Sequence, residues 1–250
     1  MESPLVSLEL SQAALLRILR PLLAEAIARH IGRLPPAAEV ARWPADLSLG
    51  AEGLGLGLDG LIDAAAAASR LFHLHERSVQ GHLVLHPRLG DWARIVGDAL
   101  GRGVSAFSFA APGGAGWPVL APRPLRRLLD EADGWAHALR DRQRVVLAVP
   151  AHEAEGCLFG VLVPRALGLP VIDRRGSLAG DLLRDLKPGD LLVANPSILQ
   201  ALATTAHRLP ADVLALSAAV AEQTAAALEA LGLSELVETT PRFEPARRAA

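Results

Sequence analysis

The 250-residue sequence is poor in the features that would assign it to a class at once. Its single cysteine, Cys157, excludes an internal disulfide, and the apolar residues around it predict a buried thiol rather than a nucleophile. A formal net charge of -2 without a Lys/Arg block argues against nucleic acid as a partner. No apolar run reaches the roughly 18 residues of a membrane span, and residues 1–4 show no secretion signal. We therefore expect a cytoplasmic protein without a membrane partner.

Common catalytic and metal-binding patterns are also missing. The Gly-x-Ser-x-Gly pattern of many hydrolases does not occur. Glycines at 53, 55 and 57 copy part of a dinucleotide-binding fingerprint, but no strand precedes them, and we interpret them as a loop. Residue types that bind metals gather in one segment, as His73, His75, Glu76, His82 and His86. Because a spacing of two places the first two rings on different sides of a helix, we expect no metal site.

The first hundred residues have a helical pattern. Apolar residues repeat at helical spacing between 15 and 31, where Pro21 is expected to break or restart the helix and Gly32 to end it. A Pro/Gly-rich stretch separates this segment from two further predicted helices, at 61–75 and 91–100. This part of the chain is therefore predicted to be all-helical.

A change of pattern near residue 102 predicts two domains, 1–101 and 102–250. The Gly101-Arg102-Gly103 junction has turn composition, and strand-like runs begin directly after it. Within the first domain, residues 56–62 (Leu-Gly-Leu-Asp-Gly-Leu-Ile) resemble the acyl-carrier signature Leu-Gly-x-Asp-Ser-Leu. Gly60 stands where that signature has the serine that carries the phosphopantetheine arm, so the segment has no oxygen to which the arm could attach.

Strands and helices alternate along the second domain. Strands that are apolar throughout and joined by helices predict an α/β fold, with a parallel sheet covered on both faces and right-handed crossovers. A ligand crevice then lies beyond the carboxyl ends of the strands. The predicted strands are 104–109, 145–149, 170–173, 191–194, 212–216 and 236–239. The predicted helices are 125–139, 157–167, 178–186, 197–207 and 218–231.

A glycine-rich loop follows the first of these strands. Residues 107–119 read Phe-Ser-Phe-Ala-Ala-Pro-Gly-Gly-Ala-Gly-Trp-Pro-Val. This outline resembles the phosphate loop of adenylate-forming enzymes (acyl- and aryl-CoA synthetases and adenylation domains), whose pattern runs Thr-Ser-Gly-Ser-Thr-Gly-x-Pro-Lys. Gly113, Gly116 and Pro118 match the pattern. Its hydroxyl residues and its lysine are replaced, at Ala111, Pro112, Gly114, Ala115 and Val119.

The resemblance continues downstream, to about residue 245. Pro150, His152 and Gly156 match the family segment Pro-x-His-His-x-x-Gly, whereas Glu153 stands where the family has the second histidine, which lines the acyl pocket. Residues 167–173 resemble the family strand Leu-Gly-x-Pro-Val-Val-Asp. The family motif Tyr-Gly-Ser-Ser-Glu-Thr, which helps to hold adenine and magnesium, is replaced at 240–245, where Glu244 alone matches.

The resemblance implies part of the large AMP-binding domain. It implies nucleotide contacts from Gly113, Gly114, Gly116 and Glu244, and contacts from His152 and Gly156 to a small carboxylic acid. A charge-assisted hydrogen bond contributes roughly 1.5–3 kcal/mol, so losing two donors weakens nucleotide binding on the order of a hundredfold. We therefore expect a truncated, impaired or non-catalytic homologue, with ATP and Mg²⁺ as cofactors only where activity remains.

Two alternatives stay open at this point. In the first, the chain is an active acid–thiol ligase that binds phosphate through the amides of its loop glycines, while another chain supplies the family's lysine-bearing domain. In the second, it is an interaction protein whose helical part docks an acyl carrier or a synthase. Pyrophosphate release from ATP and a panel of acids separates the enzyme from the other two.

Overall fold

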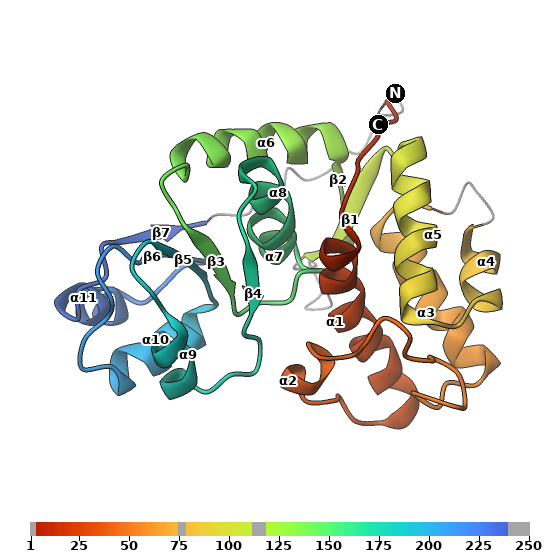
Figure 1. The fold of residues 1–250 in the computed structure, drawn as a ribbon, viewed down its shortest axis with the longest axis horizontal. Coiled ribbons are helices and arrows are strands. Elements are labelled where there is room, and N and C mark those ends of the chain that lie inside the picture. Colours follow the sequence, from red (N-terminus) through yellow and green to blue (C-terminus); the bar gives the residue numbers. More distant parts are fainter. Residues whose placement is uncertain (1–3, 75–78, 112–118, 240–250) are drawn as a thin grey trace.

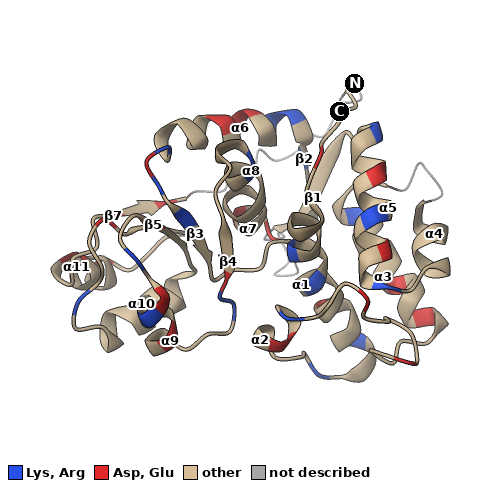
Figure 2. Ribbon diagram, in the orientation of Figure 1, with Lys and Arg blue, Asp and Glu red and all other residues tan. Residues whose placement is uncertain are grey.

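The structure is a computed structural model that describes residues 4–74, 79–111 and 119–239. N-terminal helices form one side of the molecule, and a five-stranded parallel sheet with its own helices forms the other (Figure 1). Charged residues of both signs are interspersed along the ribbon on the two sides (Figure 2). Within the described ranges, no helix combines the length and apolar character needed to cross a bilayer.

The N-terminal helices pack around a long first helix. Helix α1 is capped by Ser11, whose hydroxyl accepts a hydrogen bond from the Ala14 N–H, and it ends at Gly32, whose φ of 71° suits glycine. Helices α3 and α5 pack against α1 and bury their apolar faces. Gly60 lies buried in the first turn of α3. The helices of this part are α1 (Gln12–Ile31), α2 (Ala37–Val40), α3 (Leu58–Leu71), α4 (Val79–Leu85) and α5 (Leu89–Arg102).

The expected break at Pro21 is wrong, because α1 continues through this residue. A proline inside a helix removes one backbone hydrogen bond and costs about 3 kcal/mol. Here the prolyl ring is itself buried, and Leu19 and Leu23, two residues before and after it in the chain, are both fully buried in the core. Burying each leucine side chain contributes about 1.5–3 kcal/mol, so the packing of α1 outweighs the cost of the proline.

A hairpin follows the helices and is separate from the parallel sheet. Strand β1 (Ala106–Ala111) pairs antiparallel with β2 (Val119–Pro124), with Ala106 opposite Pro124 and Ala111 opposite Val119. The sequence pattern predicts the first of these strands as part of the parallel sheet and does not predict the second, so both expectations are wrong here. The Leu-Ala-Pro-Arg-Pro part of β2 contains two prolines, and an edge strand tolerates them because one side of it needs no ladder hydrogen bonds.

The parallel sheet confirms the predicted α/β class. Its strand order is β4-β3-β5-β6-β7, and every pair in it is parallel. The strands are β3 (Arg144–Leu147), β4 (Val171–Asp173), β5 (Asp190–Val193), β6 (Leu214–Ser217) and β7 (Glu235–Glu238). The helices of this part are α6 (Leu125–Ala138), α7 (Ala154–Cys157), a π-helical turn (Leu158–Leu162), α8 (Val163–Leu167), α9 (Ala179–Asp185), α10 (Pro196–Thr205) and α11 (Glu222–Ala230).

Alternate residues of the strands fill two hydrophobic cores, one on each face of the sheet. Val145 and Leu147 face the core that also holds the N-terminal helices, the hairpin and α6 to α8. Val146 and Leu192 face a second core with α9, α10 and α11. The first core contains residues from Leu8 to Leu216 and so includes side chains from both sides of residue 101. The domain boundary predicted at this residue stays a prediction.

Candidate functional site

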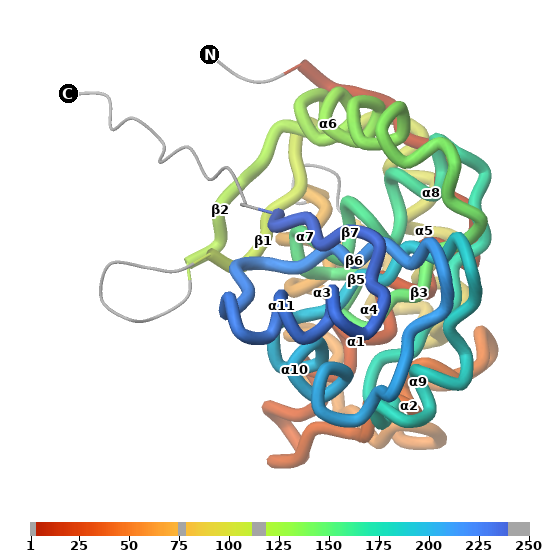
Figure 3. The backbone as a smooth tube through the Cα atoms, turned by 90° about the vertical axis from the view of Figure 1, so that its left-hand side faces the viewer, coloured from red at the N-terminus to blue at the C-terminus, as the bar shows by residue number. Residues whose placement is uncertain are grey.

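Two adjoining cavities lie beyond the carboxyl ends of β3 and β7, at the edge of the sheet where the parallel fold predicts a crevice. The first, which we name the hairpin cavity, measures about 610 Å³ and lies between α1, α3, the hairpin and residues 152–155. The second, the α6 cavity, measures about 620 Å³ and lies between β2, α6, the start of α7 and the end of β7. Figure 3 shows the hairpin beside α7 and β7, with α6 above them. Ala154 and Glu155 line both cavities.

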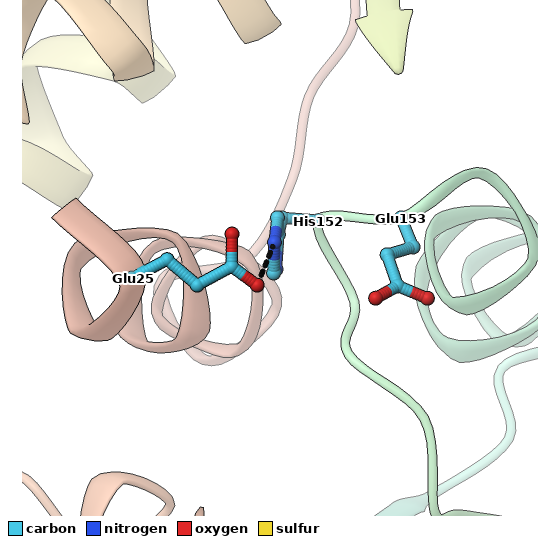
Figure 4. A group of neighbouring side chains, drawn as sticks. All are labelled: Glu25, His152 and Glu153. Atoms are coloured by element: carbon cyan, nitrogen blue, oxygen red, sulfur yellow. Dashed lines mark ion pairs between the residues drawn. The ribbon is translucent and has the colours of Figure 1, made fainter. Parts of the chain in front are cut away.

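His152 anchors the wall of the hairpin cavity. Its Nε2 lies 3.0 Å from Oε1 of Glu25 on α1 (Figure 4). The imidazole is 10% exposed and the Glu25 side chain 50% exposed. Burial raises the pKa of Glu25, but the hydrogen bond from His152, its charge and the charge of Arg29 together lower this pKa below its ordinary value. Nδ1 of His152 is buried without a hydrogen-bond partner.

Two further carboxyl groups stand at the start of α7. Desolvation raises the pKa of Glu153, assisted by the charge of Glu25 and opposed by His152. Desolvation also raises the pKa of Glu155, which accepts a hydrogen bond from the hydroxyl of Thr239 at the end of β7. This bond ties the start of α7 to the carboxyl end of the last described strand. The cavity wall is therefore rich in carboxylates.

The residues predicted from the family resemblance have different outcomes. Gly113, Gly114, Gly116 and Glu244 lie outside the described residues. His152 lines the hairpin cavity. Gly156 is explained by close packing, because a Cβ atom there would lie 2.0 Å from the carbonyl oxygen of Pro150.

Several residues of the hairpin cavity were not singled out by the sequence analysis. Arg29 and Arg70 come from α1 and α3, and Ser108 comes from β1, where its hydroxyl lies 2.6 Å from Nε2 of His73. Glu25 offered one local signal, since it is a charged residue within an otherwise apolar and buried run from Pro21 to Ile27. That signal does not reveal which distant residue the carboxylate meets.

The buried thiol predicted at Cys157 is confirmed. The residue is 2% exposed, and burial raises its pKa to about 12, although the charge of Arg123 opposes this rise. A thiol with such a pKa is protonated near neutral pH, so Cys157 does not supply a thiolate nucleophile to either cavity.

Three curated proteins of similar sequence are named 4-coumarate–CoA ligase. The chain is 32% identical over 225 residues to such a ligase from Halorhodospira halophila, covering 89% of this chain and 57% of that protein. It is 29% identical over 177 residues to the one from Cereibacter sphaeroides, covering 68% of this chain and 43% of that protein. The chain thus spans about half the length of the curated relatives it matches. No family model matches it.

Solved structures of low sequence identity include o-succinylbenzoate coenzyme A synthetase from Bacillus subtilis in complex with AMP. It is 15% identical, with a TM-score of 0.47, over 90% of this chain and 53% of that one. ATP-bound MatB from Rhodopseudomonas palustris is 13% identical, with a TM-score of 0.44, over 88% of this chain and 54% of that one. The sequence relatives carry the family assignment. The chain therefore belongs to the adenylate-forming superfamily of AMP-binding acyl- and aryl-CoA synthetases.

Proposed function

We propose that this chain is a non-catalytic member of the superfamily, which binds a small aryl carboxylic acid in the hairpin cavity and does not adenylate it. The observation that carries the proposal is Val119, the first residue of β2. It occupies the position of the phosphate-loop lysine in the family pattern, and it lies 52% exposed on the wall of the hairpin cavity. An isopropyl group there donates no hydrogen bond and carries no charge.

The charges around the cavity also disfavour a polyphosphate. Among the described residues, three carboxyl groups line it, those of Glu25, Glu153 and Glu155, against two guanidinium groups, those of Arg29 and Arg70. A triphosphate would place several negative charges beside these carboxylates, and like charges at short range repel each other. The described residues of the cavity therefore do not fit ATP with Mg²⁺.

No other lysine of the chain is placed to replace the missing one. The sequence contains a single lysine, Lys187. It precedes β5, and its backbone N–H donates to Asp190 at the first position of that strand. It therefore lies at the amino edge of the sheet, opposite the two cavities.

The same cavity has the composition of a site for a small aryl acid. Its apolar wall includes Leu22, Leu71 and Leu120, and its two guanidinium groups can pair with a carboxylate. The names of the curated relatives, 4-coumarate–CoA ligases, support an aromatic acid as the class of ligand.

Two measurements on the full chain test the proposal. We expect no pyrophosphate release from ATP and Mg²⁺ with a panel of aryl and acyl acids that includes 4-coumarate, and we expect calorimetry to detect 4-coumarate binding without ATP. Arg70→Gln should weaken that binding, whereas Arg94→Gln, on the exposed face of α5, should leave it unchanged. Acid-dependent pyrophosphate release would show an active ligase, and absence of acid binding would show that the cavity is not an acid site.

A further inference from the structure

Three potential metal ligands converge on the wall of the hairpin cavity, from segments far apart in the sequence. Glu25 comes from the middle of α1, while His152 and Glu153 follow the carboxyl end of β3 (Figure 4). One ligand atom from each side chain lies within 4.8 Å of one ligand atom from each of the other two. In the part of the chain that the structure describes, this is the only group of three or more His, Cys, Asp or Glu side chains with such spacing.

The histidine of this group is incompletely satisfied by protein groups. Its imidazole is nine-tenths buried, and Nε2 faces Glu25, but Nδ1 has no hydrogen-bond partner. Buried polar atoms are hydrogen-bonded in the large majority of cases, so an unpaired ring nitrogen needs an explanation. A simple ion pair between Glu25 and His152 uses one ring nitrogen and does not explain why Glu153 lies beside them. Occupation of the group by a cation explains the presence of all three side chains.

The donor set points to a particular class of cation. One imidazole and two carboxylates suit zinc and other first-row divalent metals, whereas Mg²⁺ and Ca²⁺ prefer oxygen ligands throughout. Tetrahedral zinc with ligand distances of about 2.1 Å separates its ligand atoms by about 3.4 Å. Nε2 of His152 already faces Oε1 of Glu25 at 3.0 Å, so Nδ1, which has no hydrogen-bond partner, is the ring nitrogen available to such a cation. Glu153 is exposed, and a change of its rotamer can bring its carboxylate to the others.

We propose that Glu25, His152 and Glu153 form a site for a divalent transition metal of the zinc type. Three protein ligands leave the fourth position open toward the hairpin cavity, for water or for an oxygen of a small acid. The cation would relieve the repulsion between the two carboxylates. Arg29 and Arg70 line the same cavity and oppose a cation, so the expected dissociation constant is micromolar rather than nanomolar.

Calorimetric titration of the metal-free full chain with Zn²⁺ tests the site, without ATP or an acid, so that its outcome is independent of the proposed function. We expect one Zn²⁺ per chain, and much weaker binding of Mg²⁺. His152→Gln, Glu25→Gln and Glu153→Gln should each weaken Zn²⁺ binding at least tenfold. Loss of the visible absorption of bound Co²⁺ in the same variants would give a second readout of ligation. Thermal unfolding checks that each variant is folded.

Two control variants separate this site from adventitious binding. Glu155→Gln changes the neighbouring carboxylate, which is bonded to Thr239, and should leave Zn²⁺ binding unchanged. The double variant His82→Gln and His86→Gln removes a histidine pair of helical spacing at α4 and should also leave it unchanged. Glu153→Gln is decisive even where His152→Gln fails to fold, because Glu153 is exposed. Absence of saturable binding, binding that survives Glu153→Gln, or binding that the histidine double variant removes would each overturn the proposal.

Discussion

The two edges of the parallel sheet carry polar clusters of opposite kinds. At the amino edge, Asp190 is fully buried and accepts hydrogen bonds from Nε and Nη2 of Arg144 at 2.6 and 2.8 Å, and from the Lys187 N–H at 2.7 Å. At the carboxyl edge, His152 has one partner and one unpaired nitrogen, beside the carboxylate of Glu153, which forms no ion pair with another described residue. A polar cluster with every group satisfied holds the fold together, whereas an incomplete one is suited to receive a ligand.

The largest effect should come from breaking the amino-edge cluster. Replacing Asp190 by Ala leaves the Arg144 guanidinium, which is 14% exposed, without its carboxylate, and removing one partner of a buried pair costs about 3–5 kcal/mol. Urea unfolding measures this loss. The matched control is Asp181→Ala, which breaks an exposed pair with Arg184 and should cost under about 1 kcal/mol. Equal losses in the two variants would show that the amino-edge cluster does not stabilise the fold.

Gly156→Ala at the carboxyl edge should cause a smaller loss in the free energy of unfolding. The added Cβ would meet the carbonyl of Pro150 at 2.0 Å, so the start of α7 must move away from the end of β3. Overpacking of this kind costs about 1–3 kcal/mol. Gly134→Ala in α6 is the control, since nothing lies within 4 Å of a Cβ atom there, and it should stabilise the helix by about 0.5–1 kcal/mol. A Gly156→Ala variant as stable as the parent would show that this close approach is relieved without cost.

The parallel sheet was predictable because its evidence is local. The strands from Arg144 to Glu238 are short apolar runs separated by helical patterns, and alternation of this kind specifies a parallel sheet. The hairpin was missed at β2, where Pro122 and Pro124 argue against a strand unless it lies at an edge. The continuity of α1 through Pro21 was missed because burial of its neighbours, which decides the outcome, is not visible in the sequence.

The site was predictable only in part. His152 was found because its motif is contiguous with Pro150 and Gly156. Its partner Glu25 lies on a helix in the other half of the chain, and only the packing of α1 beside the segment that follows β3 brings the two together. A pairing between distant segments leaves no spacing pattern, so neither the ion pair nor the metal site could be derived from the sequence.

Alkaline pH should weaken the fold gradually, through Cys157. Burial raises the thiol pKa from 9.0 to about 12, so the folded state favours the protonated form more strongly than the unfolded state does. The stability due to this group is fully present below pH 9 and is lost as the pH rises toward 12, by at most about 1.4 kcal/mol per pH unit. Urea titrations of the parent and of Cys157→Ala at several pH values measure the effect. The two proteins should show the same pH dependence below pH 9, and a parallel course above it would contradict the raised pKa.

The smallest effect should come from adding a cation to the carboxyl edge. Val119→Lys restores the charge that the family pattern has at this position, and an ammonium acts on a phosphate mainly as a point charge that salt screens. We expect tripolyphosphate affinity to rise about three- to tenfold at low ionic strength, with the gain lost at high salt, as measured by calorimetry. The control is Leu178→Lys, which adds the same charge at an exposed residue just before α9, remote from the hairpin cavity. Glu153 and Glu155 still face the cavity, so turnover with ATP should remain absent. If the two variants bind tripolyphosphate equally, the gain in affinity comes from the added net charge rather than from its position. The match of Val119 to the family lysine would then be wrong.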